Sequence, residues 1–216
     1  RYLLPGGDNV CKTQTSYVLA LAFGLTPEDE RGDTLRLLRE KLRESNMHLT
    51  TGFCGTPCLC PVLSENGGNA EAYRLLLNDD YPSWLYEIGM GATTVWERWN
   101  SVLPDGSISD TGMNSLNHYA YGSIVEWMYR YMCGINPVED APGFRRTVLR
   151  PMPDKSLSFA HASFRSPAGL FESGWEYEDE GKTILYTFTV PFNAEAELWL
   201  PGDSEPVLLA AGTHSF

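Results

Sequence analysis

The hydrophobic pattern of this chain changes its period once along the sequence, and this change limits the possible folds more than any other feature. Up to about residue 147, apolar side chains recur at the three- and four-residue spacing of helices, between loops rich in glycine and proline. From residue 148 onward, segments such as 184–190 alternate apolar with other side chains, which is typical of strands. We therefore expect a mainly helical domain over residues 1–147 and an all-β domain over residues 148–216.

Two segments of the helical part differ in surface character. Residues 15–23 are apolar on every face, so a helix there would be buried all round, and Gly24 would end it. Residues 27–46 begin with acidic and end with basic side chains, as the helix dipole favours, and carry leucines at helical spacing. Further helices are expected over residues 69–77 and 115–133. Inner and outer helices that alternate in this way indicate a toroid of helical hairpins.

The C-terminal part has the features of a small antiparallel β domain. Glu180-Gly181 stands where a hairpin turn is needed before the alternating run. Four strands are expected, over residues 170–177, 184–190, 198–200 and 207–210. The sequence predicts a β-sandwich here and shows no pattern of catalytic residues in it.

The charge of the chain excludes one class of partner. It has 28 acidic and 16 basic residues, which gives a net charge of −12. The basic residues of segment 27–46 are interleaved with acidic ones, so no patch for neutralising phosphates is expected and nucleic acid is not a predicted partner. No stretch approaches the ~20 consecutive apolar residues that cross a bilayer, so no membrane segment is predicted.

The start of the chain indicates a piece of a longer protein. It begins at Arg1, without an initiator methionine, just before a helical pattern. We expect that an N-terminal part of the parent protein is missing. The apolar helix faces that this part would cover favour association of the chain with itself, as a homodimer.

The cysteine count is odd, and the spacing fits no standard metal site. Cys54, Cys58 and Cys60 form a C-x3-C-x-C cluster without a histidine nearby, whereas Cys11 and Cys133 are distant. We expect reduced, structural thiols, which favours a cytoplasmic location. No metal site and no cofactor are predicted.

The segment that looks most functional is residues 81–99, YPSWLYEIGMGATTVWERW. It surrounds Glu97 with aromatic side chains, among them Trp84, Trp96 and Trp99. Indole rings stack on the apolar faces of sugars, and an aromatic, partly dry pocket raises the pKa of a carboxyl group toward the range useful for proton transfer. In the alternative interpretation the rings belong to the core and Glu97 pairs with Arg98 at the surface.

Several stretches together resemble the bacterial α-L-rhamnosidases. They are TQTSYVLALAFGL at residues 13–25, HLTTGFCGTP at 48–57, the segment 81–99, and NSLNHYAYGSIVEWMYR at 114–130. They occur in the order found in that family and cover nearly all of the helical part. The resemblance implies an (α/α)6 toroid followed by a C-terminal β-sandwich.

The resemblance also implies roles for individual residues. Glu97, the acid of WER, would be the general base that activates water in an inverting hydrolysis. His118, in NHYAYG, would contact the rhamnose. The substrate-binding role of Trp84, Trp96 and Trp99 is instead expected from their aromatic rings, which can form the walls of a sugar pocket. The 21 residues from Glu97 to His118 leave room for a loop that returns the chain, so that His118 would stand at the start of the helix over 115–133.

An inverting glycosidase also needs a second, protonated carboxyl group. The family's acid motif lies upstream of the matched region and is absent from this chain. Glu65, Asp105 and Glu126 are the other candidates, but they read as a loop acid, a turn residue and a charge on a helix face. We therefore expect this chain to supply only the base side of the site.

Two other functions remain open at the level of sequence. The first is another α/α-toroid glycosidase or phosphorylase, although only Arg98 lies near enough to bind phosphate. The second is a non-catalytic carbohydrate-binding fragment, which the missing acid favours. In each case the partner would be a glycoside or polysaccharide, with a rhamnosylated one implied by the resemblance.

Overall fold

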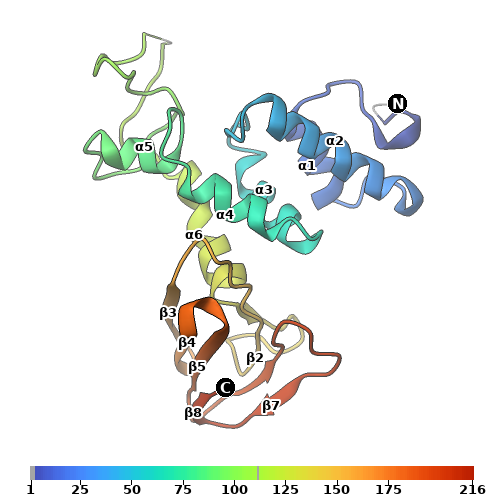
Figure 1. Ribbon diagram of the computed structural model, residues 1–216, viewed down its shortest axis with the longest axis vertical. Coiled ribbons are helices and arrows are strands. Elements are labelled where there is room, and N and C mark those ends of the chain that lie inside the picture. The colour runs from blue at the N-terminus through green and yellow to red at the C-terminus, as the bar shows by residue number, and fades with distance from the viewer. Residues whose placement is uncertain (1–2, 111) are drawn as a thin grey trace. The chain divides into compact units, whose positions relative to one another are not determined.

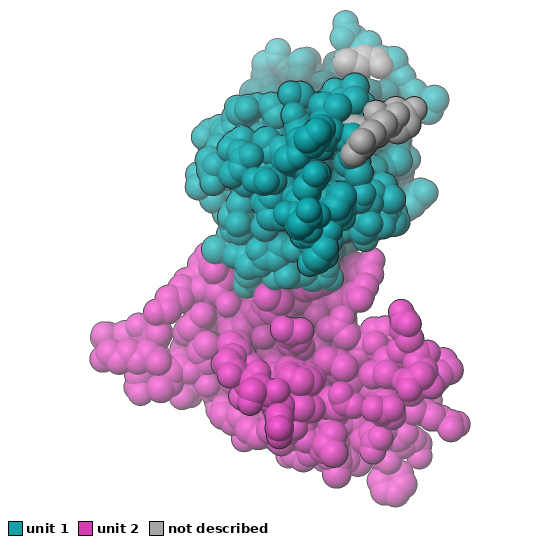
Figure 2. All heavy atoms as spheres, turned by 90° about the vertical axis from the view of Figure 1, so that its right-hand side faces the viewer, with its two compact units in different colours: residues 1–124 teal, residues 125–216 magenta. Residues whose placement is uncertain are grey.

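The computed structural model describes residues 3–110 and 112–216. The chain forms two compact units, Arg1–Ile124 and Val125–Phe216, which Figure 2 shows in teal and magenta. Helices α1 to α5 belong to the first unit, and all eight strands in the described residues belong to the second (Figure 1). The first strand begins at Ile135, earlier than the period-two pattern indicates. Strands of three or four residues are too short to show that pattern.

The first two helices form an antiparallel pair. Helix α1 spans Gln14–Ala22 and begins with a capping box, in which the Thr13 and Ser16 side chains bond each other's backbone N–H. A short 3-10 helix, Glu28–Glu30, precedes α2, Arg31–Glu44, so the helix expected over 27–46 is divided in two. Helix α2 buries only one face, whereas α1 is buried on several sides.

The second pair is α3, Thr56–Glu65, and α4, Asn69–Leu77. Helix α3 was not predicted, because Pro57 and Pro61 obscure the helical pattern, but Pro57 lies in the first turn, where proline is tolerated. Helix α3 packs on both α1 and α4. An ion pair of 2.8 Å between Arg39 Nε and Glu71 Oε1 joins α2 to α4. Helices α1 and α3 are thus the inner pair, and α2 and α4 the outer one.

The remainder of the first unit is mostly irregular. Helix α5, Trp84–Gly89, is capped by the Ser83 hydroxyl, which accepts the N–H of Tyr86. No helix or strand lies between α5 and residue 119 in the described part of this loop, where one isolated bridge joins Val102 to Ile108. This loop carries the WER segment.

The helix expected over residues 115–133 is wrong at its start. The helical stretch begins at Ala120 and runs to Met132, first as a 3-10 helix, then as α6, Ile124–Trp127, and last as a π-helix. Residues 112–119 form no helix, and the backbone groups of Ser115 and His118 bond instead to those of Glu97 and Val95. These backbone bonds compete with helix formation.

The C-terminal end of this helical stretch is fixed by the second unit. The Trp175 indole N–H donates to the carbonyl of Met132, and the Ser173 hydroxyl donates to that of Cys133. Gly134 follows with φ +78°, and a Cβ there would stand 2.2 Å from the backbone of Arg150. Glycine is therefore required at this turn.

The second unit contains two four-stranded sheets. One sheet has the order β1-β2-β6-β7, with β1 Ile135–Pro137, β2 Arg146–Leu149, β6 Glu195–Leu198 and β7 Val207–Leu209. The other has the order β3-β4-β5-β8, with β3 Phe159–Ser166, β4 Gly169–Glu178, β5 Thr183–Val190 and β8 Gly212–Ser215. The pairing is antiparallel except between β2 and β6, which are parallel. The expected antiparallel pairing thus holds for both sheets apart from the one parallel pair.

The strand predictions for β4, β5 and β7 are confirmed to within one residue, and the Asp179–Gly181 turn joins β4 to β5. The strand expected over 198–200 lies earlier, because β6 ends at Leu198. Strands β1, β2, β3 and β8 were missed because polar and small residues interrupt their alternation. In β2 and β6 every second residue is buried, and Phe171, Trp175 and Phe188 fill the buried face of the other sheet. Within the described ranges, each helix is too short or too polar to cross a lipid bilayer.

Candidate active site

Three segments of the first unit, each at or just before the start of a helix, are joined by hydrogen bonds. Thr51 lies in the loop before α3, Trp84 is the first residue of α5, and Tyr121 lies in the first turn of the stretch that leads into α6. The indole N–H of Trp99 donates to the carbonyl of Thr51 at 2.8 Å. The indole N–H of Trp84 donates to the carbonyl of Tyr121 at 3.0 Å. Two tryptophans thus tie the loops together.

The aromatic side chains at this point form one continuous cluster. The rings of Trp99 and Tyr121 stack, with centroids 4.0 Å apart and planes at 9°. Trp84 meets Trp99 edge to face at 5.1 Å, and Phe53 lies 5.5 Å from Tyr121. Phe53 is 45% exposed, whereas Trp84 and Trp99 are buried. Phe53 is the ring of this group that has most surface available for a ligand.

Glu97 lies beside this cluster and is held by two hydrogen bonds with the backbone of Ser115. Its N–H donates to the carbonyl of Ser115 at 2.8 Å, and its Oε2 accepts the N–H of Ser115 at 2.7 Å. The residue is 9% exposed. Arg98 Nε instead donates to the carbonyl of Met113, and within the described residues no ion pair joins Arg98 to Glu97. The carboxylate is thus oriented by the Ser115 backbone amide and forms no ion pair with Arg98 among the described residues.

His118 is connected to the same cluster. The His118 ring stacks on Phe53 with centroids 4.8 Å apart, and the backbone N–H of His118 donates to the carbonyl of Val95. Nδ1 accepts the N–H of Ala120 at 3.3 Å, so the neutral ring carries its proton on Nε2 and can donate it to a hydroxyl. His118 stands two residues before the 3-10 helix, so its expected place in the first helical turn is corrected.

The three predicted tryptophans have different surroundings. Trp84 and Trp99 pack on each other in the cluster, whereas Trp96 meets Tyr86 edge to face at 6.5 Å. All three are buried. In this chain they support the loop around Glu97, and their roles in substrate binding stay predictions.

Glu87 is a site residue that sequence reasoning missed. It lies on α5, is 3% exposed, and accepts the N–H of Trp96 on Oε2 at 3.4 Å. Its Oε1 is buried and has no hydrogen-bond partner in the described residues. Burial raises the pKa of this carboxyl from 4.5 to about 7, and the Trp96 amide offsets part of the rise. The available signal was an acid within the apolar sequence WLYEIG.

Tyr121 lies close enough to both acids to be affected by their charges. Burial raises the pKa of its hydroxyl, Arg98 lowers it, and Glu87 and Glu97 raise it further. The pKa of the Tyr121 hydroxyl therefore depends on the charges of Glu87, Glu97 and Arg98.

The other candidate acids have exposed positions. Glu65 is the last residue of α3, and Asp105 accepts the N–H and hydroxyl of Ser107 in a turn. Glu126 pairs with Arg130 at 2.9 Å, one turn along the helical stretch. The described part of the chain has no group of three or more His, Cys, Asp or Glu side chains placed to hold a metal ion, and no disulfide joins any of the five cysteines.

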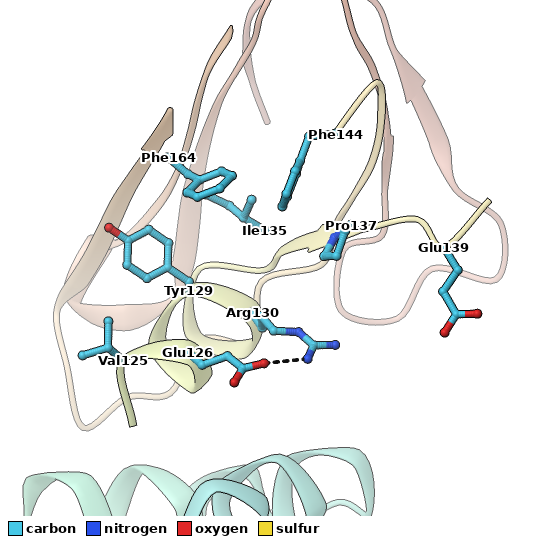
Figure 3. Close-up of a pocket in the computed structure, with 9 residues that line it drawn as sticks. All are labelled: Val125, Glu126, Tyr129, Arg130, Ile135, Pro137, Glu139, Phe144 and Phe164. Atoms are coloured by element: carbon cyan, nitrogen blue, oxygen red, sulfur yellow. Dashed lines mark hydrogen bonds and ion pairs between the residues drawn. The ribbon is translucent and has the colours of Figure 1, made fainter. Parts of the chain in front are cut away.

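A separate cavity of about 690 Å³ is formed by residues of the second unit alone. Figure 3 shows the rings of Tyr129, Phe144 and Phe164 near Ile135, and the ion pair of Glu126 and Arg130 at the edge. Phe144 and Phe164 lie 4.7 Å apart.

The sequence of the chain matches two described protein domains. Residues 1–132 match the bacterial alpha-L-rhamnosidase 6 hairpin glycosidase domain, and residues 134–214 match the bacterial alpha-L-rhamnosidase C-terminal domain. Its helical part is therefore a glycosidase domain, followed by a β-sheet domain. The chain belongs to the family of bacterial α-L-rhamnosidases, which confirms the resemblance seen in its motifs.

Curated relatives and solved structures agree with this assignment. An alpha-L-rhamnosidase of Formosa agariphila is 44% identical over 93% of this chain, and one of Streptomyces avermitilis is 42% identical over 94%. The chain spans about a fifth of the length of each, 21% and 19%.

The solved structures match over nearly the whole chain. The S. avermitilis alpha-L-rhamnosidase complexed with L-rhamnose is 37% identical, with a TM-score of 0.91 over 99% of this chain and 22% of that one. The native alpha-L-rhamnosidase of Aspergillus terreus is 34% identical, with a TM-score of 0.93 over all of this chain and 25% of that one.

Proposed function

We propose that this chain is the C-terminal part of a longer α-L-rhamnosidase, in which it supplies the base side of an inverting active site. The observation that carries the proposal is the Glu97 carboxylate. It lies beside an aromatic cluster, is oriented by the Ser115 amide, and stands in the WER motif of the family. The proposed substrate is a glycoside or polysaccharide with terminal α-L-rhamnosyl residues.

In the proposed reaction Glu97 acts on water. Its carboxylate takes a proton from a water molecule on the face of the sugar opposite the leaving group, while the water oxygen attacks the anomeric carbon. The bond to the leaving oxygen breaks, and a second carboxylic acid donates the proton that this oxygen needs. Inverting enzymes place the two carboxyl groups ~6.5–9.5 Å apart to leave room for the water.

The acid is proposed to come from outside this chain. Glu65, Asp105 and Glu126 are exposed, and the latter two are held by local contacts with Ser107 and Arg130. A general acid needs a protonated carboxyl group at neutral pH, which burial favours and these exposed positions do not provide. Glu87 is buried, but because only 3% of the residue is exposed and its carboxyl already binds the Trp96 amide, it offers almost no surface to a leaving group. Closure of the helical domain into a complete toroid would bring the acid toward Glu97 from the missing helices.

His118 and Phe53 are proposed to contact the sugar. The Nε2–H of His118 can donate to a rhamnose hydroxyl, and the exposed Phe53 ring can cover an apolar face. Rhamnose has a methyl group on C5, and burying such a carbon against aromatic rings contributes ~0.8 kcal/mol. Among the described residues, Arg98 is the one basic side chain that acts on Tyr121 at this site. A single arginine is a weak phosphate site, which disfavours the phosphorylase alternative.

The test is hydrolysis of an aryl α-L-rhamnoside by three samples: the full-length protein, the 216-residue chain alone, and the chain mixed with the separately produced N-terminal portion. We expect release of the aryl group by the first and, after reassociation, by the third, with the β-anomer of rhamnose seen first by proton NMR. Activity of the chain alone would place the acid within it. Binding of rhamnose without hydrolysis by the full-length protein would support a non-catalytic module.

A further inference from the structure

The Glu87 carboxyl group is buried without the partners that a charged carboxylate needs. One oxygen accepts a long hydrogen bond, 3.4 Å, from the Trp96 amide, and the other has no partner in the described residues. No basic side chain contributes to its electrostatic environment, in which burial is the largest effect. A buried, unpaired charge is costly, whereas a neutral carboxylic acid can keep the bond from Trp96 through its carbonyl oxygen.

The backbone N–H that Glu87 binds belongs to Trp96, the residue directly before Glu97. The Trp96 N–H bonds to Glu87, and the N–H and side chain of Glu97 bond to Ser115. A string of hydrogen bonds therefore runs from α5 through the WER segment to the backbone around His118. Because Glu97 is the next residue, a displacement of the Trp96 backbone also displaces the backbone that carries the Glu97 side chain.

The charged and titratable groups near this string limit how it can respond to pH. The charges of Glu87, Glu97 and Arg98 each affect the pKa of Tyr121, whereas neither Arg98 nor Glu97 is among the causes that shift the pKa of Glu87. If Glu87 ionises, a second negative charge appears there without a cation bound to it. The ionised carboxylate is stabilised only if water reaches it, which requires the loop that contains Trp96 to open.

We propose that Glu87 is a positioning residue for the base: as a neutral acid it holds the Trp96 peptide and keeps Glu97 in place, and its ionisation releases the loop. This inference rests on the proposed rhamnosidase function. It predicts that turnover decreases when Glu87 loses its proton, independently of the protons on Glu97 and on the general acid.

The experiment compares the full-length protein with its Glu87→Gln variant over roughly pH 5.5 to 8.5. Glutamine keeps the acceptor for the Trp96 amide and is neutral throughout. The quantity measured is the ratio of kcat for the original protein to kcat for the variant, in which the ionisations of all other groups cancel. We expect this ratio to fall by about threefold or more as pH rises, with KM nearly unchanged. A ratio that stays constant with pH overturns the proposal.

Two further variants complete the test. Glu87→Met has a similar length but no acceptor, and we expect it to lower kcat most at the low-pH end, where Glu87 of the original protein is neutral and holds the Trp96 amide; an unchanged kcat there would overturn the proposal. It also serves if Glu87→Gln does not fold. Glu126→Gln, at an exposed acid paired with Arg130, is the matched control and should give a ratio constant with pH. If the full-length protein releases no rhamnose at all, the proposed function itself fails, which these measurements distinguish from failure of the Glu87 proposal.

Discussion

The aromatic cluster around Glu97 and the cavity of the second unit contain similar residue types but differ in how their polar groups are satisfied. In the cavity, Glu126 forms an exposed ion pair with Arg130. In the cluster, Glu97 is bound by a backbone amide, and Glu87 has an oxygen with no partner in the described residues. Charges that are already neutralised in water have little to offer a reacting group, whereas a nearly buried carboxyl can hold or accept a proton.

The aromatic rings differ in the same way. In the cavity, Phe144 and Phe164 pack mainly on each other, and the Tyr129 hydroxyl donates to the carbonyl of Ser163. In the cluster, indole N–H groups bind the backbone of loops far apart in sequence, so the rings determine where Glu97 and His118 lie. The comparison teaches that two regions of similar residue composition can differ in whether their acids are paired and whether their rings bind distant backbone.

The largest expected effect is on turnover by the full-length protein with Glu97→Gln. Glutamine preserves the shape of the site but cannot accept the proton of water, so kcat should fall by roughly 10²–10⁴-fold with little change in KM. Glu126→Gln in the second unit should leave kcat unchanged. If kcat of the Glu97 variant stays within threefold of the original, Glu97 is no more important for turnover than Glu126, and its assignment as the base is wrong.

The next effect is on stability. Trp99→Ala removes a buried ring that packs on Trp84 and Tyr121 and donates to Thr51, so it should lower the free energy of unfolding by about 3–5 kcal/mol. Phe164→Ala, at a half-buried ring, should cost less. Urea denaturation followed by tryptophan fluorescence measures both. Equal losses would show that the two regions are supported alike.

A smaller effect concerns the pH dependence of stability. Because the pKa of Glu87 rises from 4.5 to about 7 on folding, the folded state binds the extra proton between these values. Its contribution is present below pH 4.5 and is lost as pH rises through about 7, by roughly 3 kcal/mol at most. The difference in unfolding free energy between the original chain and Glu87→Gln should follow this curve. The same comparison with Glu126→Gln should give no such step near pH 7.

The smallest expected effect is on sugar binding. His118→Ala should weaken binding of free rhamnose to the full-length protein by about one hydrogen bond, ~0.5–1.5 kcal/mol, measured by calorimetry or inhibition. His214→Ala is a suitable control, since that ring bonds to the carbonyl of Ala210 in the second unit. Unchanged affinity of the His118 variant would mean that the ring only supports Phe53.

The elements with a clear period were predictable, and those set by tertiary contacts were not. Helix α4 was predicted at its exact ends because its apolar spacing is regular and its termini are free of proline. The non-helical backbone around His118 was missed because backbone hydrogen bonds to Glu97 and Val95, far earlier in the sequence, hold it. Glu97 and His118 were proposed from motifs, and their roles stay predictions, whereas Glu87 was not singled out because its distinguishing property is burial, which a sequence does not display.

The helical stretch that follows Tyr121 also bears on how such proteins can exchange domains. The two matched family domains divide between residues 132 and 134, but the compact units divide between Ile124 and Val125. The carbonyls of Met132 and Cys133 are bound by Trp175 and Ser173, so a recombination event at the sequence boundary would separate a helix end from its donors. A β domain transplanted from a relative needs an indole and a hydroxyl at these two positions, or it must bring the last two turns of helix with it.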